Sequence, residues 1–372
     1  MDKKKNVIKW IVILLVVIAA GVAGFLFGKN KTASRFEAEK KQYQDINISE
    51  LDIFKNVEGP IYVTGHSNPD TDTIGSSIAY ATLLKKLGFD AKPVIIDDLN
   101  DEIEYVMSTG GIEAPEKLDD VAGKNIVLVD HSEYSQSVEG LEDANIIAII
   151  DHHGVGSIVT GNPLVYDARP VGATATLIWN RYHNYGVEID KDTAYVMACA
   201  ILSDTGNIYS DSTTSLDKEA MNELSRIAGI EDTDSLYTEM YKASISYKGL
   251  NDEEIFFSDY KEYECGDKKY GIGCVNVYDE DGAKDMIERM AKVLSDADKS
   301  TGMDLLMAQI SIFHDGISIT YLVPADEDAA DIIKRAFGDT ATYDGTSYRL
   351  EPGISRKKNL VPAITDILES DQ

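Results

Sequence analysis

Apolar and polar positions alternate in two distinct ways along the chain after residue 50. Short runs rich in β-branched residues and bounded by turn residues are typical of buried strands, whereas longer stretches with helical periodicity are typical of helices. The predicted strands are 60–65, 91–97, 125–132 and 145–153, and the predicted helices are 73–88, 174–186 and 191–206. Continuous apolar strands separated by helices indicate a parallel sheet that is buried on both faces and flanked by helices.

The pattern changes near residue 241, where a polar stretch predicts a connection between two domains. Beyond it, strands are predicted at 268–277, 305–313 and 316–323, with helices near 281–298 and 326–337. Strands joined by short turns indicate a smaller α/β domain with a mixed sheet. The sequence therefore predicts a first domain at 51–240, an inter-domain linker at 241–250 and a second domain at 251–372.

A separate apolar stretch of 18 uncharged residues runs from Trp10 to Phe27. At about 1.5 Å per residue a helix of this length spans about 27 Å, close to the thickness of a bilayer core. A cleaved signal peptide is the alternative, but no small-residue cleavage site followed by a polar stretch ends the run, which favours an uncleaved anchor. We expect a basic tail at 1–9, a single transmembrane helix at 10–28 and a polar juxtamembrane stalk at 29–50.

Lysines lie on both sides of this apolar stretch, so the positive-inside rule barely distinguishes the two orientations. A short tail that carries four lysines is a poor candidate for translocation. The sequence thus favours a single-pass protein of the cell membrane. It leans only weakly to a body outside the cell, so the membrane side of that body stays open.

The formal net charge of −29 argues against a nucleic-acid-binding surface, because nucleic acids attract basic faces. For a phosphate substrate, metal ions and a local group of Lys or Arg would have to offset this negative field. The three cysteines, Cys199, Cys265 and Cys274, show no metal-ligand spacing. Cys265 and Cys274 flank a hairpin-like segment, and whether they pair stays open.

Histidines and aspartates gather where the predicted strands of the first domain end. They are His66, Asp70, Asp72, Asp130, His131, Asp151, His152 and His153, with Asp204 at the end of a predicted helix. Because ligands bind outside the carboxyl ends of strands in open α/β sheets, we expect these side chains to lie together. Imidazole and carboxylate without thiolate favour a hard ion such as Mn²⁺, and the set is large enough for the two ions of a phosphoryl-transfer site. An aspartate before a helix is commonly an N-cap instead, and Asp72 is a candidate cap for the helix at 73–88.

The first domain contains four motifs that together resemble the DHH phosphoesterase superfamily: "GHSNPDTDTIGSSIAYATLLKKLG", "VDHSE", "IDHH" and "PVGATAT". Within it, the chain is most similar to the family II, manganese-dependent inorganic pyrophosphatases. The second domain ends in "EPGISRKKNLVPAITDIL", which resembles their DHHA2 domain and its SRKK motif. The resemblance runs from about residue 58 to residue 369 and implies a DHH metal-binding catalytic domain at 51–240 and a DHHA2 substrate-binding domain at 251–372.

The resemblance also implies roles for single residues. Six residues would hold two Mn²⁺ ions: His66 and Asp70 the first, Asp72, His152 and Asp204 the second, and Asp130 both. Four residues would contact the substrate: His153, Lys248, Arg356 and Lys357. His153 would also assist proton transfer to the leaving phosphate, and Asp130 and Lys248 would be further catalytic groups. A Mg²⁺ ion would accompany the substrate, and Co²⁺ or Mg²⁺ could replace Mn²⁺.

These expectations predict hydrolysis of inorganic pyrophosphate to two phosphates, by a hydroxide held between two Mn²⁺ ions at a site between the domains. The resemblance implies a homodimer, and no nucleic acid is expected as a stable partner. Residues 203–217 ("SDTGNIYSDSTTSLD") are instead more similar to DHH phosphodiesterases of short oligonucleotides or cyclic and linear dinucleotides. Such a phosphodiesterase is one alternative, and a non-catalytic, membrane-tethered sensor of pyrophosphate or metal is another.

Overall fold

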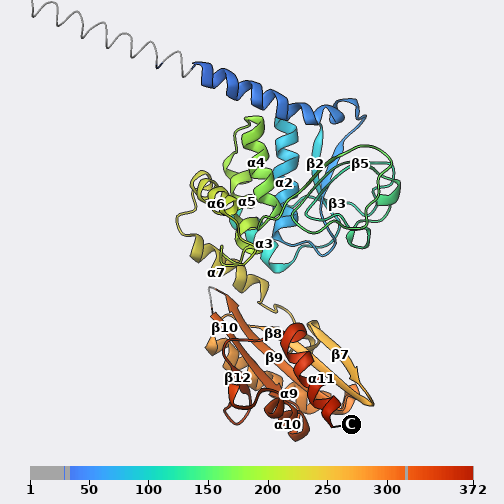
Figure 1. Cartoon of the computed structure of the whole chain (residues 1–372), viewed down its shortest axis with the longest axis vertical. Coiled ribbons are helices and arrows are strands. Elements are labelled where there is room, and N and C mark those ends of the chain that lie inside the picture. Colours follow the sequence, from blue (N-terminus) through green and yellow to red (C-terminus); the bar gives the residue numbers. More distant parts are fainter. Residues whose placement is uncertain (1–28, 30–33, 315–316, 372) are drawn as a thin grey trace, which may run out of the picture.

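Two bodies, each built around its own sheet, make up the described part of the chain (Figure 1). The computed structural model describes Lys29 and residues 34–314 and 317–371. One sheet is parallel and the other mixed, as the sequence pattern predicts. The proposed limits of the domains and linker stay a prediction.

The amino-terminal domain has a six-stranded sheet in which all strands run parallel. The strands are β1 (Ile61–Thr64), β2 (Ala91–Ile95), β3 (Glu116–Lys117), β4 (Asn125–Val129), β5 (Asn145–Asp151) and β6 (Val165–Ala168). Their spatial order is β3-β2-β1-β4-β5-β6. Strands before β4 are added on one side of β1, and β4 and the later strands are added on its other side. Parallel sheets commonly bind ligands at such a switch point, outside the carboxyl ends of the strands.

Helices cover one face of this sheet. The strands are contacted most closely by α2 (Thr71–Lys86) and α4 (Thr174–Tyr185). The helices that pack mainly against other helices are α3 (Asp101–Gly110), α5 (Lys191–Asp204), α6 (Ser215–Ala228) and α7 (Thr233–Ser244). Val127, Val129 and Ile150 point from the sheet into a core shared with α2, α4 and α5. Figure 1 shows these three helices side by side.

The other face of the sheet differs from the expected helical cover. There Ile126 and Ile149 pack against Val121 and Leu141, which belong to loops and short turns. Two of these turns are the 3₁₀ segments η2 (Tyr134–Gln136) and η3 (Leu141–Asp143). The connection between β4 and β5, residues 130–144, contains these two turns and no α-helix, so compact turns cover this face.

The start of α2 differs from the prediction in its cap. The helix begins at Thr71, and the carboxylate of Asp70 caps it by accepting a hydrogen bond of 2.8 Å from the backbone N–H of Thr73. Asp72 therefore lies inside the first turn and is not the cap. Further along α2, a Cβ on Gly75 would lie 2.8 Å from the carbonyl oxygen of Val196, so glycine at this position lets α2 and α5 approach closely.

The carboxyl-terminal domain has a mixed sheet with the order β11-β12-β10-β9-β8-β7. Its strands are β7 (Tyr260–Cys265), β8 (Lys268–Asn276), β9 (Leu305–His314), β10 (Ile317–Pro324), β11 (Ala341–Tyr343) and β12 (Tyr348–Leu350). Its helices are α8 (Asp252–Ser258), α9 (Glu280–Thr301), α10 (Glu327–Phe337), the π-helical η5 (Arg356–Leu360) and α11 (Val361–Ser370). The strands and helices predicted at 268–337 are all present.

The hairpin of β7 and β8 separates the two cysteines that flank it. Cys265 is paired with Lys268 beside the turn, whereas the backbone N–H of Cys274 bonds to Asp259 at the far end of the hairpin. Six residues of extended strand cover about 20 Å, which is too far for a disulfide. Both thiols are free.

The segment predicted as a stalk is in part a helix that contacts the amino-terminal domain. Residues 34–48 are helical, and Ile48 packs against the core of the domain. The 3₁₀ segment η1 (Ser49–Asn56) follows, and its Glu50 accepts a hydrogen bond of 2.6 Å from the buried Arg181. The predicted transmembrane helix at 10–28 lies outside the described residues. Within the described ranges, no helix is both long and apolar enough to cross a membrane.

Candidate metal centre

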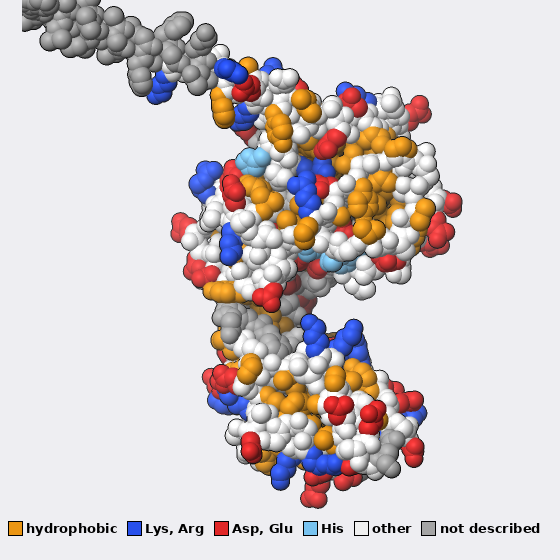
Figure 2. Space-filling view, in the orientation of Figure 1, with side chains coloured by type: hydrophobic (Ala, Val, Ile, Leu, Met, Phe, Trp, Pro, Cys, Tyr) orange, Lys and Arg blue, Asp and Glu red, His pale blue; other side chains and the backbone are white. Residues whose placement is uncertain are grey.

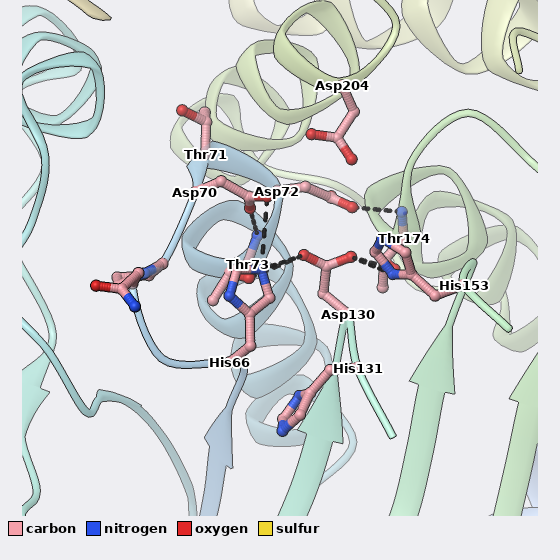
Figure 3. A network of polar contacts seen from close by, with 12 residues as sticks. His66, Asp70, Thr71, Asp72, Thr73, Asp130, His131, His153, Thr174 and Asp204 are labelled. Atoms are coloured by element: carbon pink, nitrogen blue, oxygen red, sulfur yellow. Dashed lines mark hydrogen bonds and ion pairs between the residues drawn. The ribbon is translucent and has the colours of Figure 1, made fainter. Parts of the chain in front are cut away.

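The candidate site lies where β1, β4 and β5 end, under the carboxyl end of α5 (Figure 3). The six predicted metal ligands and His153 lie around this point: His66 after β1, Asp70 and Asp72 at the start of α2, Asp130 after β4, His152 and His153 after β5, and Asp204 at the end of α5. Asp130 has a positive φ of 66° directly after β4. A non-glycine residue rarely adopts this conformation, so the fold imposes it at the point where the carboxylate turns into the site.

Asp130 occupies the centre of the cluster and is only 1% exposed. Its Oδ2 accepts a hydrogen bond of 2.8 Å from Thr73, and its Oδ1 accepts one of 3.1 Å from Thr174. The same Oδ2 lies 3.4 Å from His66 Nε2, and Oδ1 lies 3.3 Å from His152 Nε2. Each oxygen of this carboxylate therefore faces one histidine, while a threonine hydroxyl fixes its orientation.

The side chains form donor groups that share Asp130. One group is His66, Asp70 and Asp130, and a second is Asp72, Asp130, His152 and Asp204, with the donor atoms of each group within 4.8 Å of one another. His153 forms a third such group with Asp130 and His152. The first two groups contain the same residues that the family resemblance assigns to the two ions. The structure thus brings these residues together, and metal binding by each of them stays a prediction.

The histidine tautomers fit a metal. Nδ1 of His66 lies 2.8 Å from the carbonyl oxygen of Ser67, and Nδ1 of His152 lies 3.1 Å from that of Val171. A ring nitrogen beside a carbonyl carries the proton, which leaves Nε2 of each neutral ring as a lone-pair donor. His152 Nε2 is buried without a hydrogen-bond partner although it faces carboxylates. A cation between them would satisfy both partners, so the donor set fits a divalent ion.

Burial and mutual repulsion shape the charges of this cluster. Burial raises the pKa of Asp72 and that of Asp204, and the neighbouring Asp130 carboxylate raises them further. Burial lowers the pKa of His66, but the carboxylates of Asp130 and Asp70 outweigh it and raise the value to about 11. The pKa of His152 rises to about 9 for the same reason, against the same opposing effect of burial. When no cation is bound, protons on these groups would therefore supply the positive charge.

The metal-free protein is expected to lose stability as the pH rises from 6.5 to 9. The folded state holds protons on His66 and His152 up to pKa values of about 11 and 9, whereas the unfolded chain releases them near 6.5. A histidine whose pKa is raised on folding stabilises the fold below the unfolded pKa, and this contribution is lost as the pH rises through the folded pKa. The raised carboxyl pKa values of Asp72 and Asp204 act in the same direction.

Thermal unfolding of the EDTA-treated protein should measure this effect as a midpoint that falls by several degrees over that pH range. The Mn²⁺-treated protein should keep its midpoint, because bound metal replaces the protons. Equal slopes with and without metal would contradict the interpretation.

The hydrogen bonds that hold the carboxylates of the site in place were not predicted from the sequence. The carboxylate of the fully buried Asp72 accepts hydrogen bonds of 2.6 and 2.9 Å from the backbone N–H groups of Thr174 and Ala175, at the start of α4. Asp217 holds the loop before that helix and its first turn by accepting bonds from Gly172 N–H and Thr176 Oγ1. The motif "PVGATAT" signalled this segment, but nothing in it identified which groups bond to the carboxylates.

Asp151 and His131 lie beside the donor groups and not in them, among the residues described. Oδ1 of the buried Asp151 accepts hydrogen bonds from the backbone N–H of His153 at 3.0 Å and from its Nδ1 at 3.1 Å. His131 is buried, with Nε2 3.0 Å from Ser137 Oγ. Asp151 thus orients the ring of His153, whose side chain is 56% exposed and can meet a ligand from solvent.

The basic residues predicted to hold substrate differ in their surroundings. Arg356 is mostly buried at the start of η5 and makes three hydrogen bonds, all within the carboxyl-terminal domain. Lys357 is exposed beside it. Lys248 is exposed and lines a pocket against Asp101 and Glu104 of α3. That pocket is lined by none of the predicted metal ligands, and the role of Lys248 in substrate binding stays a prediction.

Comparison with known proteins agrees with this two-domain arrangement. Residues 60–201 match the DHH family, N-terminal domain, and residues 238–367 match the DHHA2 domain. A probable manganese-dependent inorganic pyrophosphatase of Clostridium acetobutylicum is 38% identical over 323 residues, which cover 84% of this chain and 99% of that protein. The manganese-dependent inorganic pyrophosphatase of Methanocaldococcus jannaschii is 38% identical over 312 residues, covering 82% of this chain and 97% of that protein.

A solved structure is similar as well. A crystal structure from Methanococcus jannaschii, assigned to the family II inorganic pyrophosphatases, aligns with a TM-score of 0.55 at 37% identity, over 82% of this chain and 98% of that one. The fold and the two domain matches define the chain as a DHH protein with a DHHA2 domain. At the identity and coverage just given, it belongs to the family of manganese-dependent inorganic pyrophosphatases.

Proposed function

We propose that this chain is a manganese-dependent enzyme that hydrolyses inorganic pyrophosphate to two phosphates. The observation that carries the proposal is the shared carboxylate of Asp130, each of whose oxygens faces a different histidine and a different donor group. Relatives that match nearly their whole length are named manganese-dependent inorganic pyrophosphatases, which supports the same substrate and metal.

Each site residue has a role in this proposal. His66 and Asp70 would hold one Mn²⁺, Asp72, His152 and Asp204 the other, and Asp130 both. When bound, the two ions would supply positive charge for the phosphate oxygens and lower the pKa of a water molecule. The second-sphere threonines and backbone N–H groups keep the carboxylates in fixed orientations, so the site is preorganised before substrate arrives.

His153 is suited to proton transfer. The carboxylate of Asp151 raises the pKa of His153 through a hydrogen bond to Nδ1. With Nδ1 held there, Nε2 is the N–H that can donate to an oxygen of the leaving phosphate.

Opposite the metal centre, basic groups would neutralise the second phosphate. Arg356 and Lys357 both lie at the start of η5. Figure 2 shows Lys and Arg side chains gathered on the edge of the carboxyl-terminal domain that is turned toward the amino-terminal domain, with histidine visible on the facing rim. Closure of the two domains would bring the two sets of groups onto one substrate and exclude water.

The full-length chain, purified in detergent and supplied with Mn²⁺, should release phosphate rapidly from pyrophosphate and leave a linear dinucleotide intact. Colorimetric phosphate release and chromatography of the nucleotide products measure the two activities in parallel. Nucleoside monophosphate formed from the dinucleotide, with pyrophosphate untouched, would favour the phosphodiesterase alternative. Tight pyrophosphate binding without turnover would favour a sensor.

We also propose that residues 10–28 anchor the enzyme in the cell membrane, with the catalytic body on the outer side. The apolar stretch from Trp10 to Phe27 supports the anchor, and the lysine-rich tail supports the orientation. A homodimer is a further expectation from the family. Membrane fractionation, protease protection of the body in intact cells and light scattering of the purified protein test these three points.

A further inference from the structure

The guanidinium group of Arg356 is held mainly by Asp259, with one further bond to the backbone of β8. Nη2 donates a hydrogen bond of 2.6 Å to Asp259 Oδ1, and Nη1 donates one of 2.6 Å to the backbone oxygen of the same aspartate. Nη1 also lies 3.2 Å from the carbonyl oxygen of Ile272 in β8. Asp259 thus contacts both terminal nitrogens of the arginine, through its side chain and its backbone.

These three bonds leave a defined part of the arginine for a ligand. They use both N–H groups of Nη1 and one of Nη2, and the Cys274 thiol also lies beside the guanidinium. The N–H of Nε and the second N–H of Nη2 take no part in these three bonds. These two lie on the same edge of the planar group and point in parallel, which is the geometry that binds two oxygens of one phosphate.

The surroundings of the pair indicate that it is fixed before substrate binds. The side chain of Arg356 is 11% exposed, whereas that of Asp259 is 56% exposed. Asp259 lies between the end of α8 and the start of β7. Its bonds to Arg356 therefore link the SRKK segment to α8 and β7, the first elements after the predicted inter-domain linker. An arginine ordered in advance loses less conformational entropy when it binds a phosphate.

We infer that Asp259 is a positioning residue for substrate binding, which holds the Nη1–Nη2 edge of Arg356 and so presents its Nε–Nη2 edge to a phosphate of pyrophosphate. This inference rests on the function proposed above. Asp259 acts through Arg356 and contacts no substrate. If Asp259 instead competed with phosphate for the arginine, Asp259→Ala would lower KM for pyrophosphate.

The test is a double-mutant cycle on the full-length chain with Asp259→Ala, Arg356→Ala and both together. Asp259→Ala should raise KM for pyrophosphate about tenfold and change kcat less than about threefold, which is the range expected for loss of a charge-assisted contact. In the Arg356→Ala background, Asp259→Ala should add less than about twofold, because no guanidinium is left to position. Asp259→Glu should recover part of the lost affinity.

Two controls separate positioning from general damage. Asp267→Asn changes an exposed aspartate in the turn of the same hairpin and should leave KM unchanged. Mn²⁺ content of Asp259→Ala should match that of the wild type, since the predicted metal ligands all lie in the other domain. A modest fall in the thermal midpoint is expected, because the mostly buried Arg356 loses its carboxylate partner. If Asp259→Ala does not fold, Asp259→Asn keeps the size of the side chain and should give a smaller rise in KM of the same kind.

Several outcomes would overturn the inference. An unchanged or lowered KM in Asp259→Ala would do so, as would equal effects of Asp259→Ala with and without Arg356. An inactive wild-type protein would overturn the proposed function itself and this inference with it. Active wild type with an unaffected Arg356→Ala variant would remove only the role of the arginine and of Asp259.

Discussion

Asp130→Asn is expected to lower kcat/KM for pyrophosphate by at least about a thousandfold. Asp130 belongs to every donor group found among the described residues, and its two oxygens face His66 and His152. Asparagine keeps the shape of the side chain, but it removes the charge and replaces one oxygen with an amide nitrogen that cannot bind a metal. Mn²⁺ content, measured by mass spectrometry after gel filtration, should fall along with activity.

The matched control is Asp98→Asn. Asp98 also lies just beyond the end of a strand of the same sheet, but its side chain is 95% exposed and pairs only with the exposed Lys117. This variant should retain wild-type activity and metal content. An Asp130→Asn protein with full activity and two Mn²⁺ ions per chain would refute the central role of the aspartate.

The acidic and histidine residues of the site could be predicted because their signal is local. Each stands directly after an apolar run, and parallel strands bring their carboxyl ends to one edge. His66, Asp130 and His152 could therefore be placed near one another before any distance was known. The sheet type followed in the same way from the continuous apolar strands.

The remaining contacts depend on parts of the chain that are distant in sequence. Thr73 and Thr174 both bond to Asp130, but threonines occur throughout the chain, and no local pattern identifies these two. The cap of α2 is Asp70 and not Asp72 because the helix begins at Thr71, two residues earlier than predicted. Asp72 accepts instead from N–H groups of α4. The helix at 34–48 has few apolar residues, and its position depends on contacts distant in sequence. Ile48 packs on the core of the domain, and in the following η1 segment Glu50 accepts a bond from Arg181.

Among substitutions outside the predicted metal ligands, Asp217→Asn is expected to cause the largest loss of stability, and it should also weaken Mn²⁺ binding. Asp217 is fully buried and accepts four hydrogen bonds, from Gly172 N–H at 2.9 Å, from Thr176 Oγ1 at 2.6 Å, and from Thr214 N–H and Oγ1 at 2.7 and 2.6 Å. All four partners are donors. An asparagine can keep one oxygen for the donors of Gly172 and Thr214 and turn its amide nitrogen toward Thr176 Oγ1, which can also accept. It loses the negative charge that strengthens all four bonds.

The loop that Asp217 binds contacts both halves of the metal centre. Val171 accepts the bond from His152 Nδ1, and Thr174 bonds to Asp72 and Asp130. We therefore expect Asp217→Asn to reduce the free energy of unfolding by about 3 kcal/mol and the thermal midpoint by about 6–12 °C. Mn²⁺ affinity should fall about ten- to a hundredfold, as is usual when second-sphere contacts are lost.

Thermal unfolding and Mn²⁺ titration of the variant measure these two effects separately. Asp232→Asn is the matched control, because Asp232 caps α7 by accepting from Ser235 N–H at an exposed position, and asparagine caps as well as aspartate. A stable Asp217→Asn protein with weakened Mn²⁺ binding would mean that the loop acts mainly on the metal centre. A destabilised protein with unchanged Mn²⁺ affinity would mean that the loop and the metal centre are independent. A contact that only stabilises the fold leaves the orientation of His152 and Asp72 unchanged in the molecules that remain folded.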